Sequence, residues 1–185
     1  MIKIFSTNNP NKAEITKQML EENNINITIN DQPLSVPKGT LVVEAAKQIG
    51  IEIPVFCYHE KLGPFGCCRM CLVEVEKMPK LTTACTQTVM PDMVVKTESP
   101  KVIKAQQGVL EFTLLNHPLD CPVCDKGGEC PLQNNTFKYG PGDTRMEFER
   151  ANRDKATPLS PVITIDRERC IACQRCTRYS DIIEQ

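Results

Sequence analysis

The sequence of 185 residues contains no tryptophan, and aromatic residues make up only 5% of it. Such a composition supplies few of the large side chains that fill the core of a single compact domain of this length. Proline and glycine are common by contrast, with 14 and 9 residues. We therefore expect several small modules, each stabilised by a bound metal centre.

The sequence also lacks any apolar run near the roughly 20 residues needed to cross a bilayer. Residues 1–22 are mostly polar and contain three glutamates and no arginine, unlike a secretory signal or a mitochondrial transit peptide. We therefore expect a chain without direct membrane insertion. Among its eleven cysteines, we interpret the clustered Cys-x2-Cys pairs as metal ligands rather than as disulfides. The net charge of −1 gives no general attraction to nucleic acid.

Hydrophobic periodicity predicts a mixed sheet with one helix in the first half of the chain. A βα piece over residues 1–24 precedes a hairpin, in which isoleucines alternate with polar residues. Thr40 is the predicted cap of the first helix, and Ser99 with Pro100 opens the next one. After the hairpin, the predicted elements are a helix over 41–49, strands over 72–76, 81–84 and 93–96, and a helix from 100 to about 115 with Phe112 on its apolar side. A polar connector over 135–160 and a short strand over 162–165 are predicted to follow. This order is typical of a β-grasp sheet, so we expect an α+β fold.

The first cysteine set is Cys57, Cys68, Cys71 and Cys85, with gaps of ten, two and thirteen residues. Three thiols on one loop and a fourth returning later fit a 2Fe–2S cluster, although the plant-type pattern has four residues in its first gap. Zinc bound by four cysteines is the alternative, but such sites usually pair two Cys-x2-Cys knuckles and this set has one. Cys67 is interpreted as a spare thiol.

The second set is His117, Cys121, Cys124 and Cys130, spaced His-x3-Cys-x2-Cys-x5-Cys on a stretch rich in Pro, Gly and Asp. Side chains on such a loop can converge on one metal centre. One imidazole and three thiolates suit a 4Fe–4S cluster, and replacing a thiolate by imidazole changes the charge that sets the reduction potential. Zinc is a competitor for this set taken alone.

The third set is Cys170, Cys173 and Cys176, which matches the start of a 4Fe–4S motif. In two-cluster ferredoxins a further cysteine follows after three residues, and that position here is Ser180. We interpret the sequence as a fragment whose fourth ligand for this cluster lies beyond Gln185.

These motifs resemble the N-terminal part of the large iron–sulfur subunit of NADH:quinone oxidoreductase, respiratory complex I. The resemblance covers residues 26–185 and rests on Phe56-Cys-Tyr-His59, Cys68-Arg-Met-Cys71-Leu-Val-Glu-Val-Glu76, the loop from His117 to Cys130, and Cys170-Ile-x-Cys173-x-Arg-Cys176. It implies one 2Fe–2S cluster on the first set, one 4Fe–4S cluster on the second, and another 4Fe–4S cluster on the third, completed by a downstream cysteine. The extension over 1–24 and Cys67 depart from the family pattern.

The resemblance also implies a function. Single electrons would pass from a flavin- and NADH-binding subunit toward quinone, with ion translocation by the whole complex and no independent catalytic site in this chain. The expected partners are that flavin subunit, other iron–sulfur subunits and, indirectly, the membrane arm. The expected location is a peripheral arm on the cytoplasmic face of a bacterial inner membrane.

Two alternatives stay open at this point. One is the electron-transfer subunit of an NAD-linked or iron-only hydrogenase or of a formate dehydrogenase, against which Ser180 argues. The other is a multi-zinc structural or binding module, although Arg175, Arg178 and Tyr179 are few for nucleic-acid binding. We expect four units: an extension over 1–24, a 2Fe–2S domain over 25–100, a helix with the first 4Fe–4S module over 101–140, and the start of a second over 141–185.

Overall fold

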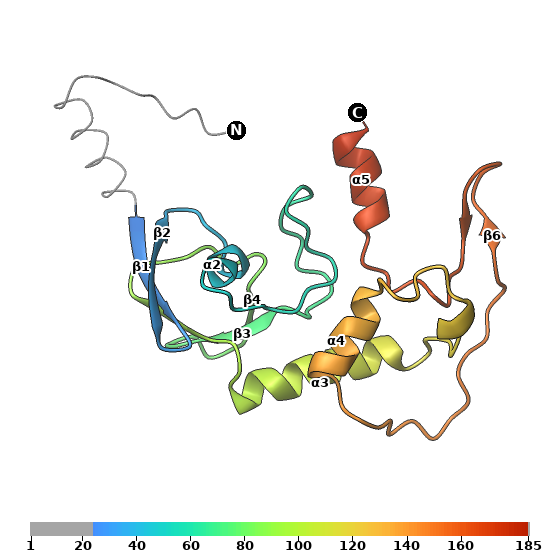
Figure 1. The fold of residues 1–185 in the computed structure, drawn as a ribbon, viewed down its shortest axis with the longest axis horizontal. Coiled ribbons are helices and arrows are strands. Elements are labelled where there is room, and N and C mark those ends of the chain that lie inside the picture. Colours follow the sequence, from blue (N-terminus) through green and yellow to red (C-terminus); the bar gives the residue numbers. More distant parts are fainter. Residues whose placement is uncertain (1–23, 185) are drawn as a thin grey trace.

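The computed structural model describes residues 24–184, and its largest unit is a five-stranded sheet in the order β2-β1-β5-β3-β4 (Figure 1). The predicted hairpin is confirmed, since β1 and β2 pair antiparallel, whereas β5 runs parallel to β1 and antiparallel to β3. The predicted βα extension lies outside the described residues except for Asn24. The strands are β1 (Asn24–Ile29), β2 (Gln32–Pro37), β3 (Leu72–Val75), β4 (Thr82–Thr83) and β5 (Met93–Lys96).

Helix α2 (Val42–Gln48) packs on one face of this sheet. The alternating pattern of β1 buries Ile27 and Ile29 against the apolar side of α2, as the two-residue period requires. The predicted cap is wrong. Leu41 is the N-cap residue, and the Thr40 hydroxyl donates instead to the Pro37 carbonyl at 2.7 Å, closing the turn before the helix.

Helix α3 (Pro100–Leu114) begins where the sequence predicted, with the Ser99 hydroxyl accepting from the Val102 backbone N–H at 3.4 Å. Its inner side buries Leu110, and the Gln106 amide donates to the Leu72 carbonyl at 3.1 Å, which ties the helix to strand β3. Phe112 was expected on the apolar side and is 81% exposed. It lies two positions from Leu110, about 200° around the helix, so the two side chains face opposite ways.

The remaining chain contains helices that the sequence analysis did not predict. The predicted connector over 135–160 in fact begins with the second half of a helix, and the predicted strand near Val162 is shorter, with Val162 itself 90% exposed. Helix α4 lies near α3 (Figure 1), and their leucines Leu132 and Leu110 pack in one cluster. The elements are η1 (Cys121–Val123), α4 (Pro131–Tyr139), the paired strands β6 (Thr157–Pro158) and β7 (Thr164–Ile165), and α5 (Arg175–Ile183).

Helix α4 is also tied to the segment that leads into the first cysteine set. The Asn135 amide donates to the Val55 carbonyl at 3.3 Å, and the Tyr139 hydroxyl donates to the Glu52 carbonyl at 3.2 Å. No helix among residues 24–184 is both long enough and apolar enough to span a membrane.

Candidate iron–sulfur sites

The first cysteine set lies where the long loop enters strand β3. Cys57 and Cys68 come from the loop, and the Cys57 backbone N–H donates to the Cys68 sulfur at 3.5 Å. Cys71 directly precedes β3 and Cys85 follows β4, so the antiparallel pairing of these strands brings the two thiols together. Cys57, Cys71 and Cys85 are buried, and Cys68 is half-buried.

The surroundings of Cys85 favour its thiolate, the form that binds metal. Its sulfur accepts a hydrogen bond from the Cys71 thiol and further bonds from the backbone N–H groups of Phe65 and Gly66, which together lower its pKa to about 6. Gly66 has φ +72°, and a Cβ at this position would lie 2.9 Å from the Thr86 methyl group. A glycine is therefore required to bring these donors close to the sulfur.

Two further residues, His59 and Cys67, lie beside the first set in the sequence. His59 is exposed, and its Nδ1 accepts from the Lys61 backbone N–H at 3.2 Å, as in a surface turn. Desolvation of the Cys67 sulfur and its proximity to the thiols of Cys57, Cys68 and Cys173 raise the pKa of Cys67 to about 11. The pKa of Cys71, a member of the first set, is raised as well, so the interpretation of Cys67 as a spare thiol stays a prediction.

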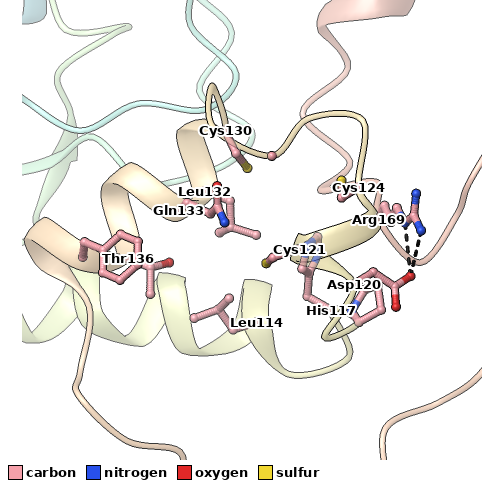
Figure 2. Close-up of a pocket in the computed structure, with 13 residues that line it drawn as sticks. Leu114, His117, Asp120, Cys121, Cys124, Cys130, Leu132, Gln133, Thr136 and Arg169 are labelled. Atoms are coloured by element: carbon pink, nitrogen blue, oxygen red, sulfur yellow. Dashed lines mark hydrogen bonds and ion pairs between the residues drawn. The ribbon is translucent and has the colours of Figure 1, made fainter.

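The second set lines a cavity of about 190 Å³ between the end of α3 and the start of α4 (Figure 2). His117 follows α3, Cys121 begins the short helix η1, and Cys130 is the N-cap residue of α4. Cys124 lies between them on a tight loop in which the Gly127 N–H donates to its carbonyl at 2.9 Å. A Cβ on Gly127 would lie 3.0 Å from the Cys121 carbonyl oxygen, so this loop needs glycine to close.

Burial of His117 favours a neutral imidazole, the form that ligates a metal. Burial is the main cause that lowers its pKa, and the nearby guanidinium groups of Arg150 and Arg169 act in the same direction. Asp120 opposes them, but its carboxylate is held by Arg169 Nε at 3.1 Å and by Lys155 Nζ at 2.7 Å.

One buried polar atom indicates that the cavity suits a sulfur-rich group. Thr136 on α4 lines the cavity, and its hydroxyl has no hydrogen-bond partner within residues 24–184 (Figure 2). A buried donor of this kind normally has a partner, and a cluster sulfur in the cavity would accept its hydrogen bond. Three thiols, one imidazole and this free donor are groups of the chemical type that a 4Fe–4S cluster accepts.

The third set lies on an irregular turn before α5. Cys170 and Cys176 are exposed and Cys173 is half-buried. The backbone N–H of Ala172 donates to the Cys170 sulfur at 3.4 Å, and Arg175 Nε donates to the Cys173 sulfur at 3.4 Å. Two sulfurs of the third set therefore accept hydrogen bonds from groups of the same turn.

The three sets meet at one small apolar cluster. This cluster consists of the buried residues Phe56, Met70, Leu110 and Leu132, which come from the first loop, α3 and α4. Cys68 of the first set, Cys130 of the second and Cys173 of the third all pack against it. A single dry core therefore contacts each candidate site. Nevertheless, no three His, Cys, Asp or Glu side chains between residues 24 and 184 have the mutual spacing of a metal site.

This sheet, followed by cysteine-bearing loops around a shared core, defines an iron–sulfur protein built from more than one cluster-binding module. Residues 22–100 match the family described as a 2Fe-2S iron-sulfur cluster binding domain, and residues 106–145 match the NADH-ubiquinone oxidoreductase-G iron-sulfur binding region. The matched residues belong to the NADH-quinone oxidoreductase-G family of iron–sulfur subunits.

Comparison with individual relatives points to the same family. The chain is 54% identical over 162 residues to the NADH-quinone oxidoreductase-G subunit of Streptomyces coelicolor, covering 86% of this chain and 19% of that protein. It is 49% identical over 160 residues to the corresponding protein of Rickettsia bellii, covering 86% and 23%. A crystal structure of an NAD+-reducing [NiFe]-hydrogenase has TM-score 0.74 at 28% identity, with 84% of this chain and 65% of that chain covered. The chain spans about a fifth of the length of these curated relatives.

Several residues that contribute to the sites were not found from the sequence. Phe56 and Met70 lie inside the cysteine motifs, but nothing in their spacing signals that they meet helices α3 and α4. Thr136 was assigned to a connector because the sequence around it is polar. Its position on α4, one helical turn from Leu132, was the available signal.

Proposed function

We propose that this chain is the part of an NADH:quinone oxidoreductase that relays single electrons from a flavin- and NADH-binding subunit toward quinone. The observation that carries the proposal is the apolar cluster of Phe56, Met70, Leu110 and Leu132, which one cysteine of each set contacts. Sites that contact one apolar core lie near one another, as electron transfer between metal centres requires. The family matches point the same way.

The proposed ligands follow from the sequence motifs. The sheet with α2 would be a β-grasp domain over 25–100 that holds the 2Fe–2S cluster. The module over 101–140 would hold a 4Fe–4S cluster, and the segment over 141–185 would begin a second one, whose fourth ligand comes from elsewhere. The proposed ligand sets are Cys57, Cys68, Cys71 and Cys85, then His117, Cys121, Cys124 and Cys130, then Cys170, Cys173 and Cys176.

When bound, each cluster supplies reversible one-electron chemistry. The residues of this chain would orient the ligands, exclude water and set the local charge. Backbone N–H groups hold the Cys85 thiolate, and Asp120 is neutralised by Arg169 and Lys155 beside the second set. Ligation would require the thiols of each set to lie closer together than they do among residues 24–184. No independent catalytic site is proposed.

The proposed partners are the flavin subunit and further iron–sulfur subunits of the same complex, with the membrane arm reached only through them. The proposed location is a peripheral arm on the cytoplasmic face of a bacterial inner membrane. The hydrogenase-linked alternative is favoured less, because the structural likeness to the NAD+-reducing hydrogenase has 28% identity against 54% for the Streptomyces coelicolor relative.

Iron and acid-labile sulfide analysis, with electron paramagnetic resonance of the reduced protein, tests the proposal. We expect a two-iron signal and a four-iron signal from the purified chain. Cys124→Ala should abolish the four-iron signal of the His117 loop and leave the two-iron signal, and Cys71→Ala should do the reverse. Zinc without labile sulfide in the native protein would contradict the redox function.

A further inference from the structure

A buried arginine joins the third cysteine set to the loop of the first. Arg178 on α5 is 8% exposed, although it follows the exposed Cys176 by two residues. Its Nη1 donates to the Cys57 carbonyl at 2.8 Å, and its Nη2 donates to the carbonyls of Leu62 at 2.5 Å and Gly63 at 3.0 Å. These contacts span more than 110 positions in the sequence.

The partners of this guanidinium are neutral. They are three carbonyl oxygens and the ring of Phe65. The ring centre lies 4.5 Å from the Arg178 guanidinium carbon, in cation–π geometry. Burying a charge is unfavourable unless polar partners replace water, and here all the replacements come from the loop over 57–65. A planar group with several fixed donors can contact three carbonyls and stack on a ring at once, whereas an ammonium group cannot.

The Arg178 guanidinium also places a positive charge beside the first cysteine set. The carbonyl that Arg178 contacts belongs to Cys57, a proposed ligand of the 2Fe–2S cluster. A full positive charge in a buried site acts more strongly on a neighbouring metal centre than an exposed one. It stabilises the reduced cluster, which carries one more negative charge than the oxidised cluster.

We propose that Arg178 is a positioning residue that fixes the segment Cys170–Cys176 on the loop bearing Cys57 and raises the reduction potential of the 2Fe–2S cluster. The anchoring follows from contacts within this chain, and the effect on the potential rests on the proposed function. Arg178 would thus set both the distance between two cluster sites and the driving force between them.

The test compares Arg178→Gln, Arg178→Lys and Lys61→Gln in the purified chain with its clusters. Lys61→Gln is the matched control because it removes a positive charge from the same loop, at an exposed position. Two quantities are measured for each variant. These are the amide hydrogen exchange of residues 175–183 and the midpoint of the two-iron signal in a redox titration followed by electron paramagnetic resonance.

We expect Arg178→Gln to speed exchange in α5 by about tenfold or more, since several charge-assisted hydrogen bonds are lost. Its two-iron midpoint should move to a more negative potential than the control shows. Arg178→Lys should also speed exchange, because one ammonium cannot reproduce the contacts, but should keep the midpoint closer to that of the native chain. The two variants should therefore both show faster exchange but differ in midpoint, which separates the anchoring of α5 from the effect of the Arg178 charge on the potential.

Unchanged exchange in α5 in both Arg178 variants, with the two-iron signal intact, would overturn the anchoring. A midpoint in Arg178→Gln that matches Lys61→Gln would overturn the effect on potential. If Arg178→Gln does not fold, the Lys variant decides the anchoring, because native exchange there would refute it. Absence of a two-iron signal from the native chain would refute the proposed function, whereas exchange in α5 would still test the anchor.

Discussion

Replacing Leu110 by alanine should selectively weaken the part of the protein where the three cysteine sets meet. Leu110 is fully buried on α3 and packs in a cluster with Phe56, Met70 and Leu132. Truncating a buried leucine costs about 2–5 kcal/mol, and the loss is largest where the neighbours cannot move into the space. Phe56 and Met70 lie within the cysteine motifs, and Leu132 lies in the first turn of α4. These neighbours therefore have little freedom to move into the space left by the leucine side chain. We expect a loss of about 3–4 kcal/mol.

A loss of that size lowers the equilibrium constant for folding of this region by more than a hundredfold, at about tenfold for each 1.4 kcal/mol. The larger core between the sheet and α2 is a separate cluster of buried residues, so it should be affected less. Denaturation with guanidinium chloride, in which the two-iron and four-iron signals are followed separately, measures how differently the two cores are destabilised. In Leu110→Ala the four-iron signal should disappear at a clearly lower denaturant concentration.

Val95→Ala is the matched control because Val95 is fully buried in the larger core, on strand β5. It should lower the denaturant midpoint of the two-iron signal more than that of the four-iron signal. Equal shifts of both signals in both variants would mean that the two cores unfold as one unit. That result would refute the division into a sheet module and a separate apolar cluster.

Three further variants test single contacts. Thr136→Val removes the free hydroxyl of the second cavity and should make the four-iron potential about 20–60 mV more negative, measured by redox titration, because one hydrogen bond to sulfur is lost. An unchanged potential would place that hydroxyl away from the cluster. Cys67→Ala should leave both signals at full intensity, and loss of the two-iron signal would instead make Cys67 a ligand. Tyr58→Phe removes a 2.7 Å hydrogen bond to Glu44, and should lower the free energy of unfolding of the sheet module by about 1.5–3 kcal/mol in denaturant titrations. An unchanged free energy of unfolding would show that the Tyr58–Glu44 hydrogen bond makes no net contribution to stability.

The sequence was sufficient for the elements whose signals are local. Alternating isoleucines predicted β1, and Ser99 with Pro100 predicted the start of α3, because each depends on residues a few positions apart. The cysteine spacings likewise placed the second and third candidate sets each on one short stretch of the chain. The shared apolar cluster could not be predicted, since Phe56 and Leu132 lie far apart in sequence and meet through packing.

Helices α4 and α5 were missed for a related reason. Both bury few apolar side chains, because α4 buries Leu132 and Asn135, and α5 buries Arg178 while Tyr179, Ile182 and Ile183 are exposed. Periodicity identifies helices that bury apolar side chains, and these two are held instead by hydrogen bonds to distant carbonyls. The Thr40 cap failed because a competing acceptor, the Pro37 carbonyl, lies within reach of the hydroxyl.

The anchoring of α5 has a consequence for limited proteolysis. Residues 141–156 form no helix or strand and are mostly exposed, which makes this stretch a preferred place for a protease to cut. The piece after such a cut would still be joined to the rest through Arg178 and through the ion pairs of Asp120 with Arg169 and Lys155. A nicked protein should therefore migrate as one species in a native gel and as two in denaturant, so the fold retains its third cysteine set without an intact chain.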